Sequence, residues 1–147
     1  EILWRGQESS EVMEAFAGNL LYVGHRIGVS KILTPLENLR WSAGLQRHVG
    51  DDVLLEALAA VGLRGFEESP CYTLSAGQQQ RVSLARLRLS QATLWILDEP
   101  FTTLDANAVE QLESTLTEHA EQGGAVIVTT HHKLSMPGLT RLTLGVR

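Results

Sequence analysis

Two adjacent carboxylates stand directly after an apolar run of the chain. Residues 94–97 read Leu-Trp-Ile-Leu, and Asp98 and Glu99 follow at once. Ligands of open α/β sheets bind at the carboxyl ends of strands, and two carboxylates buried there without a partner are costly. A Mg²⁺ ion with a polyphosphate would be such a partner. Asp98 would hold the ion through water, and Glu99 would orient or deprotonate the attacking water. A strand end that emerges into solvent explains the same pair without a function.

A second motif, Leu-Ser-Ala-Gly-Gln at residues 74–78, has the composition of a helix start that faces an anion. Ser75 is a good N-cap residue, and Gly77 lets a backbone approach a ligand closely. The N-terminus of a helix also offers free N–H groups and the positive end of the helix dipole. An ordinary capped helix explains Ser75 equally well, but it gives no reason for Gly77, which weakens the first turn.

His131 is the third residue whose position could support chemistry. It follows Thr130 and the apolar run Ala-Val-Ile-Val-Thr at residues 125–129. Because the carboxyl ends of parallel strands meet at one edge of a sheet, we expect His131 at the edge that carries Glu99. The alternative is a structural or simply exposed histidine.

The elements that must position these residues alternate between strands and helices. Short apolar runs predict strands at residues 2–6, 20–23, 94–97 and 125–129, and rough alternation indicates an edge strand at 139–146. Helical spacing and capping residues predict helices that begin at Thr34-Pro35, at Asp51 or Asp52, at Ser75 and at Asp105. This order predicts right-handed crossovers and a parallel sheet, with residues 30–73 as a small helical insertion.

Composition excludes several classes of protein. The formal net charge is −5, and the densest basic cluster is Arg81, Arg86 and Arg88. That cluster is expected to be the solvated face of one helix, so nucleic acid is not a predicted partner. No apolar run approaches the ~20 residues of a membrane span. The single cysteine, Cys71, excludes an internal disulfide and a cysteine-based zinc site.

Taken in their order along the chain, these motifs resemble those of the ABC ATPase family over nearly the whole sequence. The resemblance implies a signature motif at 74–78, a Walker B motif at 94–98 and a D-loop at 102–105. It also implies a catalytic role for Glu99 and a switch role for His131. The implied cofactors are ATP and Mg²⁺, with Asp98 as the metal residue and the nucleotide bound by Ser75, Ala76, Gly77, Gln78, Asp105 and His25.

The fold class that the resemblance implies is α/β. It is a P-loop NTPase three-layer fold with a parallel sheet and an inserted helical subdomain, its N-terminal part missing. Residues 1–29 would be the remnant of the N-terminal core strands and the Q-loop region. Residues 30–73 would be the helical subdomain that docks on membrane subunits. Residues 74–147 would hold the signature helix and the C-terminal half of the ATPase core.

The chain departs from the family pattern at two points. It contains no Gly-Lys pair, so the Walker A loop G-x-x-x-x-G-K-S/T is absent from it. The resemblance implies that such a loop precedes Glu1, and that residues 1–147 alone are inactive although the full-length protein is an ATPase. The second departure is His25, which stands where a Q-loop glutamine is usual. Histidine is shorter than glutamine and titrates near neutrality.

Within the family, four features are similar to the haem-exporter ATPase subunits of bacterial cytochrome c biogenesis: Gly24-His25, residues 33–39, Ala76 in the signature and residues 93–101. This resemblance implies a homodimer of ATPase subunits that works with integral-membrane permease subunits. The dimer would power haem export from the cytoplasmic face of the bacterial inner membrane. The alternatives are the ATPase of another small-molecule exporter and an inactive truncated domain. A DNA-associated ABC protein is disfavoured because the chain has no sustained heptads.

Overall fold

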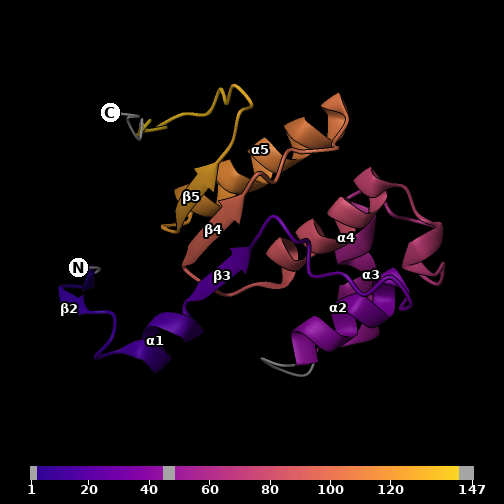
Figure 1. The fold of residues 1–147 in the computed structure, drawn as a ribbon, viewed down its shortest axis with the longest axis horizontal. Coiled ribbons are helices and arrows are strands. Elements are labelled where there is room, and N and C mark those ends of the chain that lie inside the picture. Colours follow the sequence, from indigo (N-terminus) through magenta and orange to yellow (C-terminus); the bar gives the residue numbers. More distant parts are fainter. Residues whose placement is uncertain (1–2, 45–48, 143–147) are drawn as a thin grey trace.

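The computed structural model describes residues 3–44 and 49–142 of the chain (Figure 1). The elements are β1 Leu3–Trp4, β2 Gln7–Glu8, α1 Met13–Gly18, β3 Leu20–Val23, α2 Pro35–Gly44, α3 Asp51–Ala60, the 3-10 helix η1 Cys71–Thr73, α4 Ala76–Leu89, β4 Leu94–Asp98, α5 Ala106–Glu121 and β5 Ala125–Thr129. Two short strands and a helix come first, several helices then separate β3 from β4, and one helix separates β4 from β5.

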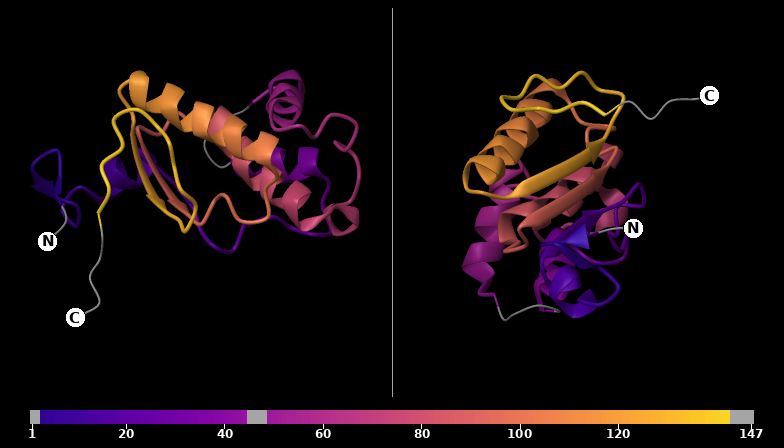
Figure 2. Two further views of the ribbon diagram at one scale, coloured as in Figure 1. Left: turned by 90° about the horizontal axis from the view of Figure 1, so that it is seen from above. Right: turned by 90° about the vertical axis from the view of Figure 1, so that its left-hand side faces the viewer.

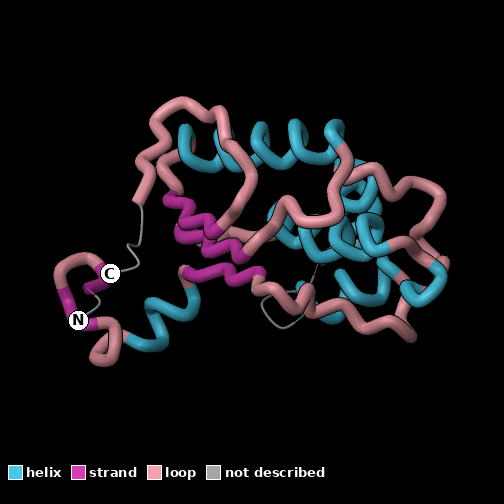
Figure 3. Tube along the Cα trace, turned by 45° about the horizontal axis from the view of Figure 1, so that its top comes forward, coloured by secondary structure: helices cyan, strands magenta, loops and turns pink. Residues whose placement is uncertain are grey.

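A three-stranded parallel sheet forms the centre of the molecule, in the order β3-β4-β5 (Figure 3). Leu21 of β3 lies beside Trp95 of β4, and Trp95 lies beside Val126 of β5. The predicted strands at 20–23, 94–97 and 125–129 are therefore confirmed, with β4 in the middle. Parallel neighbours need long crossovers, which α2, α3 and α4 supply between β3 and β4, and α5 supplies between β4 and β5.

Helices α4 and α5 cover one face of this sheet. Trp95 and Leu97 of β4 are buried there among leucines of the two helices, namely Leu84, Leu87, Leu112 and Leu116. Figure 2 shows α5 running along the sheet. The opposite face is open among the described residues: Tyr22 and Ile127 are each 54% exposed, and Ile96 is only half-buried. A strand that is apolar on both faces, such as 94–97, is typical of a sheet covered on both sides, and in the described residues it is covered on one.

A second core joins α2, α3 and α4 at one end of the molecule, opposite the β1–β2 hairpin (Figure 1). Leu39, Leu54, Leu58 and Val82 are almost fully buried in it. The start of α2 is as predicted. Thr34 Oγ1 accepts a hydrogen bond from the N–H of Glu37, and a Glu37 carboxylate oxygen accepts one from the N–H of Thr34. This reciprocal capping stabilises the first turn.

Two predictions about the elements are confirmed only in part, since α3 begins at Asp51 and a strand forms at Leu3–Trp4, and a third is contradicted in the described residues. Helix α3 has Gly50 as its N-cap, without a side-chain cap. The carboxylate of Asp51 instead binds the Arg40 guanidinium at 2.9 and 3.2 Å. The strand predicted at 2–6 has two described residues, paired with β2 across a turn. Residues 139–142 form no strand, and the remainder of the predicted edge strand lies outside the described residues.

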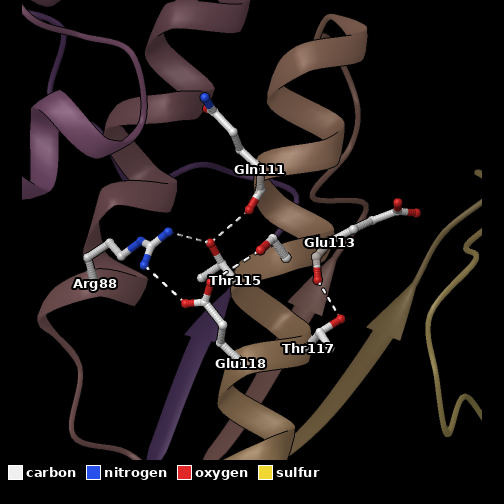
Figure 4. Close-up of polar contacts among 7 residues, drawn as sticks. Arg88, Gln111, Glu113, Thr115, Thr117 and Glu118 are labelled. Atoms are coloured by element: carbon white, nitrogen blue, oxygen red, sulfur yellow. Dashed lines mark hydrogen bonds and ion pairs between the residues drawn. The ribbon is translucent and has the colours of Figure 1, made fainter.

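The arginines of α4 are engaged with the protein and do not form a solvated face. Arg88 Nη2 donates to Thr115 Oγ1 at 3.0 Å, and Arg88 Nη1 lies 3.4 Å from a Glu118 carboxylate oxygen (Figure 4). Burial lowers the pKa of the Arg86 guanidinium, because a charged group loses solvation in the interior. Arg81 pairs with Asp105, at the start of α5. The contacts of Arg81 and Arg88 join α4 to α5 and its N-cap.

Candidate functional site

The predicted carboxylate pair lies where strands β4 and β5 end together. Asp98 is the last residue of β4, and its backbone is in register with Thr129, the last residue of β5. The Thr129 hydroxyl donates a hydrogen bond to Asp98 Oδ1. The same edge carries Glu99 and His131, which are in contact, so the prediction that strand ends bring His131 to the edge of Glu99 is confirmed. Thr129 orients the Asp98 carboxylate, and the second carboxylate oxygen has no hydrogen-bond partner among the described residues.

Glu99 adopts a backbone conformation that is rare for its type. Its φ is +51°, in the left-handed region that non-glycine residues occupy at a cost of about 1–3 kcal/mol. The N–H of Glu99 donates to the carbonyl of Thr129 at 2.9 Å, and its carbonyl accepts from the N–H of Thr102 at 3.3 Å. The Pro100 that follows is fully buried. Surrounding contacts thus hold Glu99 in a conformation that the isolated chain would avoid.

His131 meets Glu99 through two groups. The backbone N–H of His131 donates to Glu99 Oε2 at 3.4 Å, and its ring Nε2 lies 3.3 Å from Glu99 Oε1. The His131 side chain is 99% exposed, whereas that of Glu99 is 25% exposed. Exposed pairs of this kind contribute little to stability. The contact therefore matters for the position of the imidazole beside the carboxylate more than for folding.

Two further residues of this edge were not predicted. Thr129 holds Asp98, as described above, and the ring of His132 stacks on Phe101 with centroids 5.2 Å apart. The Thr-Thr-His-His run at the end of a predicted strand was the available signal. It was interpreted for His131 alone, because nothing in the sequence indicates which polar side chain reaches across to the neighbouring strand.

The signature motif forms the N-terminus of α4, as predicted. Ser75 Oγ accepts from the N–H of Gln78 at 3.2 Å, and Gln78 Oε1 accepts from the N–H of Ser75 at 2.9 Å. This capping box leaves the N–H groups of Ala76 and Gly77 without a hydrogen-bond partner in the described part of the chain. Two free N–H groups at the positive end of a 14-residue helix can bind an anion.

Gly77 also has a packing role inside the protein that the sequence did not indicate. A Cβ at this position would stand 2.6 Å from the carbonyl oxygen of Thr103. The backbones of α4 and of the segment after Glu99 therefore approach each other more closely than any other residue type would allow. The glycine is needed for this packing whether or not an anion binds.

The remaining predicted residues lie apart from the carboxylates. Asp105 Oδ1 caps α5 by accepting from the N–H of Ala108 at 2.9 Å, and its other oxygen pairs with Arg81. His25 is exposed, two residues after β3. Among the described contacts none joins His25, Ser75 or Asp105 to Asp98 or Glu99, so one chain brings together Asp98, Glu99 and His131 only.

The donor set at this edge fits a magnesium–nucleotide complex. No described group of three or more His, Cys, Asp or Glu residues forms a dedicated metal cage. Mg²⁺ commonly needs only one or two carboxylates, with waters and substrate phosphates as its other ligands. Asp98, with one oxygen held by Thr129, and the neighbouring Glu99 supply carboxylates of that kind.

The chain belongs to the ABC transporter family, whose sequence profile matches residues 1–102. Among curated proteins it is 51% identical over 146 residues to the cytochrome c biogenesis ATP-binding export protein CcmA of Hahella chejuensis, covering 99% of this chain and 69% of that protein. The protein of the same name from Pseudomonas fluorescens is 52% identical over 147 residues, covering 99% of this chain and 70% of the relative. The resemblance stated above to this subfamily is therefore confirmed.

Among solved structures, the dimeric post-hydrolysis state of the ATP-binding cassette MJ0796, bound to ADP and Pi, superposes with a TM-score of 0.72 at 26% identity. The match covers 85% of this chain, and the chain spans 57% of that cassette. The predicted α/β fold of an ABC ATPase is thereby confirmed. In the part of the chain that the structure describes, no helix has the length and apolar character needed to span a membrane.

Proposed function

We propose that this protein is the ATP-binding and ATP-hydrolysing subunit of an exporter that serves cytochrome c maturation, with haem as the exported group. The observation that carries the ATPase part is the meeting of Asp98, Glu99 and His131 at one sheet edge. The export part rests on about 51% identity to proteins named for cytochrome c biogenesis export.

The three residues divide the reaction between them. Asp98 would hold Mg²⁺, which would supply positive charge to the phosphates of ATP when bound. Glu99 orients the attacking water and accepts its proton. His131, whose imidazole lies 3.3 Å from the Glu99 carboxylate, contacts the γ-phosphate or the water through its ring. A preorganised carboxylate of this kind needs little rearrangement in the transition state.

The active unit in this proposal is a homodimer with two-fold symmetry. In this proposal the N–H groups of Ala76 and Gly77 bind the nucleotide held by the partner subunit, with Ser75, Gln78 and Asp105 around the same nucleotide. Two copies related by a two-fold axis would each complete the other's site. The solved cassette MJ0796 is itself described as dimeric, which supports this arrangement. His25, at the end of β3, would complete the nucleotide site from the Q-loop position.

We assign three regions to this chain. Residues 1–29 belong to the core and Q-loop region, 30–73 form the helical subdomain, and 74–147 carry the signature helix and the rest of the core. The helical subdomain exposes Ile32, Trp41 and Tyr72, an apolar surface suited to integral-membrane permease subunits. Docking there places the protein at the cytoplasmic face of a bacterial inner membrane. Nucleic acid has no role in the proposal.

ATP binding also requires a phosphate-binding loop, and residues 1–147 contain no Gly-Lys pair. The test compares phosphate release by residues 1–147 with that by the protein expressed from its complete reading frame. We expect MgATP hydrolysis by the second and none by the first. Restored cytochrome c maturation in a strain that lacks its own CcmA protein would support haem export. Hydrolysis without such restoration favours another exporter, and no hydrolysis by the complete protein overturns the ATPase assignment.

Replacing His131 by Ala is expected to impair ATP turnover with little change in folding. The imidazole is almost fully exposed, so its removal costs little packing, whereas its contact with Glu99 is lost. Phosphate release in the presence of the membrane partners and thermal unfolding are the two measurements. His132→Ala is the matched control, because that neighbouring ring stacks on Phe101 and makes no hydrogen bond or ion pair with Glu99 among the described contacts. An intact ATPase rate in His131→Ala would identify an ordinary surface histidine.

A further inference from the structure

The segment of residues 99–105, the 99–105 loop, connects the end of β4 to the cap of α5. It contains two non-glycine residues with positive φ, Glu99 at +51° and Thr103 at +67°. Its own backbone supplies two hydrogen bonds, from the N–H of Thr102 to Glu99 and from the N–H of Leu104 to Phe101. Unfavourable backbone conformations persist only where the surroundings enforce them, so contacts from outside must hold this loop.

Helix α4 provides three such contacts from one side. Gln80 is buried, and its Nε2 donates to the carbonyl of Pro100 at 3.2 Å. Arg81 pairs with Asp105 at the far end of the loop. Gly77 packs against the carbonyl of Thr103. Positions 77, 80 and 81 are spaced i, i+3, i+4, so they share one face of the helix, and that face follows the loop from Pro100 to Asp105.

We infer that Gln80 is a positioning residue for Glu99, with Arg81 in a supporting role; the inference rests on the catalytic role proposed above for Glu99. The amide of Gln80 fixes the carbonyl immediately after Glu99 and so restricts rotation about the bonds that set the Glu99 backbone. Without this donor, the Pro100 carbonyl is buried and unpaired. The loop can then relax toward ordinary backbone angles, which turns the Glu99 carboxylate away from its water.

The same contacts join the signature end of α4 to the catalytic carboxylate of the same chain. Ser75 lies five residues before Gln80 on one helix, and a helix transmits displacement of its end as a rigid element. An anion seated on the N–H groups of Ala76 and Gly77 therefore acts on the loop that holds Glu99. Gln80 therefore couples nucleotide binding at the signature motif to the position of the Glu99 carboxylate.

The test uses Gln80→Met, which keeps the length and apolar stem of the side chain and removes the donor. In the protein from the complete reading frame, we expect kcat for ATP hydrolysis to fall by about 10²-fold, the effect typical of a small misplacement of a catalytic group. KM for ATP should change less than about twofold, because Gln80 contacts no nucleotide in this proposal. Arg81→Gln, at a less buried position, should also lower kcat while KM stays nearly unchanged, but the fall in kcat should be smaller.

Arg88→Gln is the matched control. Arg88 also joins α4 to α5, through Glu118 and Thr115, but it lies two turns beyond Gln80 and away from the loop (Figure 4). A variant that loses only attachment of α4 to α5 should keep the wild-type kcat. An equal loss of kcat in Arg88→Gln would show a general effect of helix packing and overturn the inference.

A second readout does not depend on catalysis. Hydrogen exchange of the amides of Thr102 and Leu104, measured without nucleotide, should be faster in Gln80→Met than in the wild type and unchanged in Arg88→Gln. Unchanged exchange, or unchanged kcat in both Gln80→Met and Arg81→Gln, overturns the inference. A wild-type protein that hydrolyses no ATP overturns the proposed function instead, and the exchange rates then still decide whether Gln80 holds the loop.

Discussion

Replacing Glu99 by Gln is expected to preserve ATP binding and to lower the rate of hydrolysis by about 10²–10⁴-fold, the usual contribution of a general base. Glutamine keeps the shape of the side chain, and its carbonyl oxygen can still accept from the N–H of His131. It cannot accept a proton from water at neutral pH. The backbone of position 99 should stay in place, because Thr129 and Thr102 hold it through main-chain hydrogen bonds that the substitution does not change.

The measurement is single-turnover phosphate release alongside equilibrium binding of MgATP, in the protein from the complete reading frame. Glu118→Gln is the matched control. It makes the same chemical change at a carboxylate of α5 that pairs with Arg88 of α4. We expect that control to hydrolyse ATP normally. Hydrolysis by Glu99→Gln at the wild-type rate would remove Glu99 from the catalytic role.

Replacing Ser75 by Arg is expected to abolish nucleotide-dependent dimerisation. Ser75 stands at the exposed start of α4, where the proposed dimer brings the γ-phosphate of the partner's nucleotide. An arginine side chain fills that space and prevents close approach of the two subunits. ATP binding by each separate subunit should remain near normal, because in this proposal the signature motif contacts only the nucleotide of the opposite subunit. Hydrolysis should be lost with the dimer.

Sedimentation with ATP in a Glu99→Gln background measures this effect, since the closed dimer should accumulate when hydrolysis is blocked. The change to arginine also removes the capping hydroxyl, which alone costs about 1 kcal/mol of stability. Ser75→Ala separates the two causes: it loses the cap but leaves the space open, and it should still dimerise. Complete dimer formation by Ser75→Arg would show that residues 74–78 are only a helix cap.

The sequence predicted those parts of the fold that depend on local patterns. Thr34, Ser75 and Asp105 all cap helices where the sequence placed helix starts, because a cap involves residues only three positions apart. Asp98, Glu99 and His131 were brought to one edge by a rule about strand ends, which needs strand order but no side-chain detail. Both kinds of prediction can be made without knowledge of long-range contacts.

The features that the sequence did not predict depend on partners far along the chain. Asp51 was assigned as a cap, but Arg40 eleven residues earlier binds its carboxylate, and Gly50 takes the capping position. The sequence explained Gly77 by the close approach of a ligand, yet the group that requires a glycine there is the carbonyl of Thr103. Gln80 was one of three consecutive glutamines, and nothing local distinguishes the buried one from its neighbours.

The open face of the central sheet bears on how residues 1–147 behave in solution. Tyr22 and Ile127 stand exposed on it, and the sheet ends on either side at β3 and β5, whose outer edges have no neighbour in the described residues. Unpaired strand edges beside apolar side chains are templates for pairing between molecules. Preparations of residues 1–147 in isolation are therefore prone to aggregate as concentration rises. The yield and solubility of residues 1–147 should improve when they are produced together with a polypeptide that covers this face.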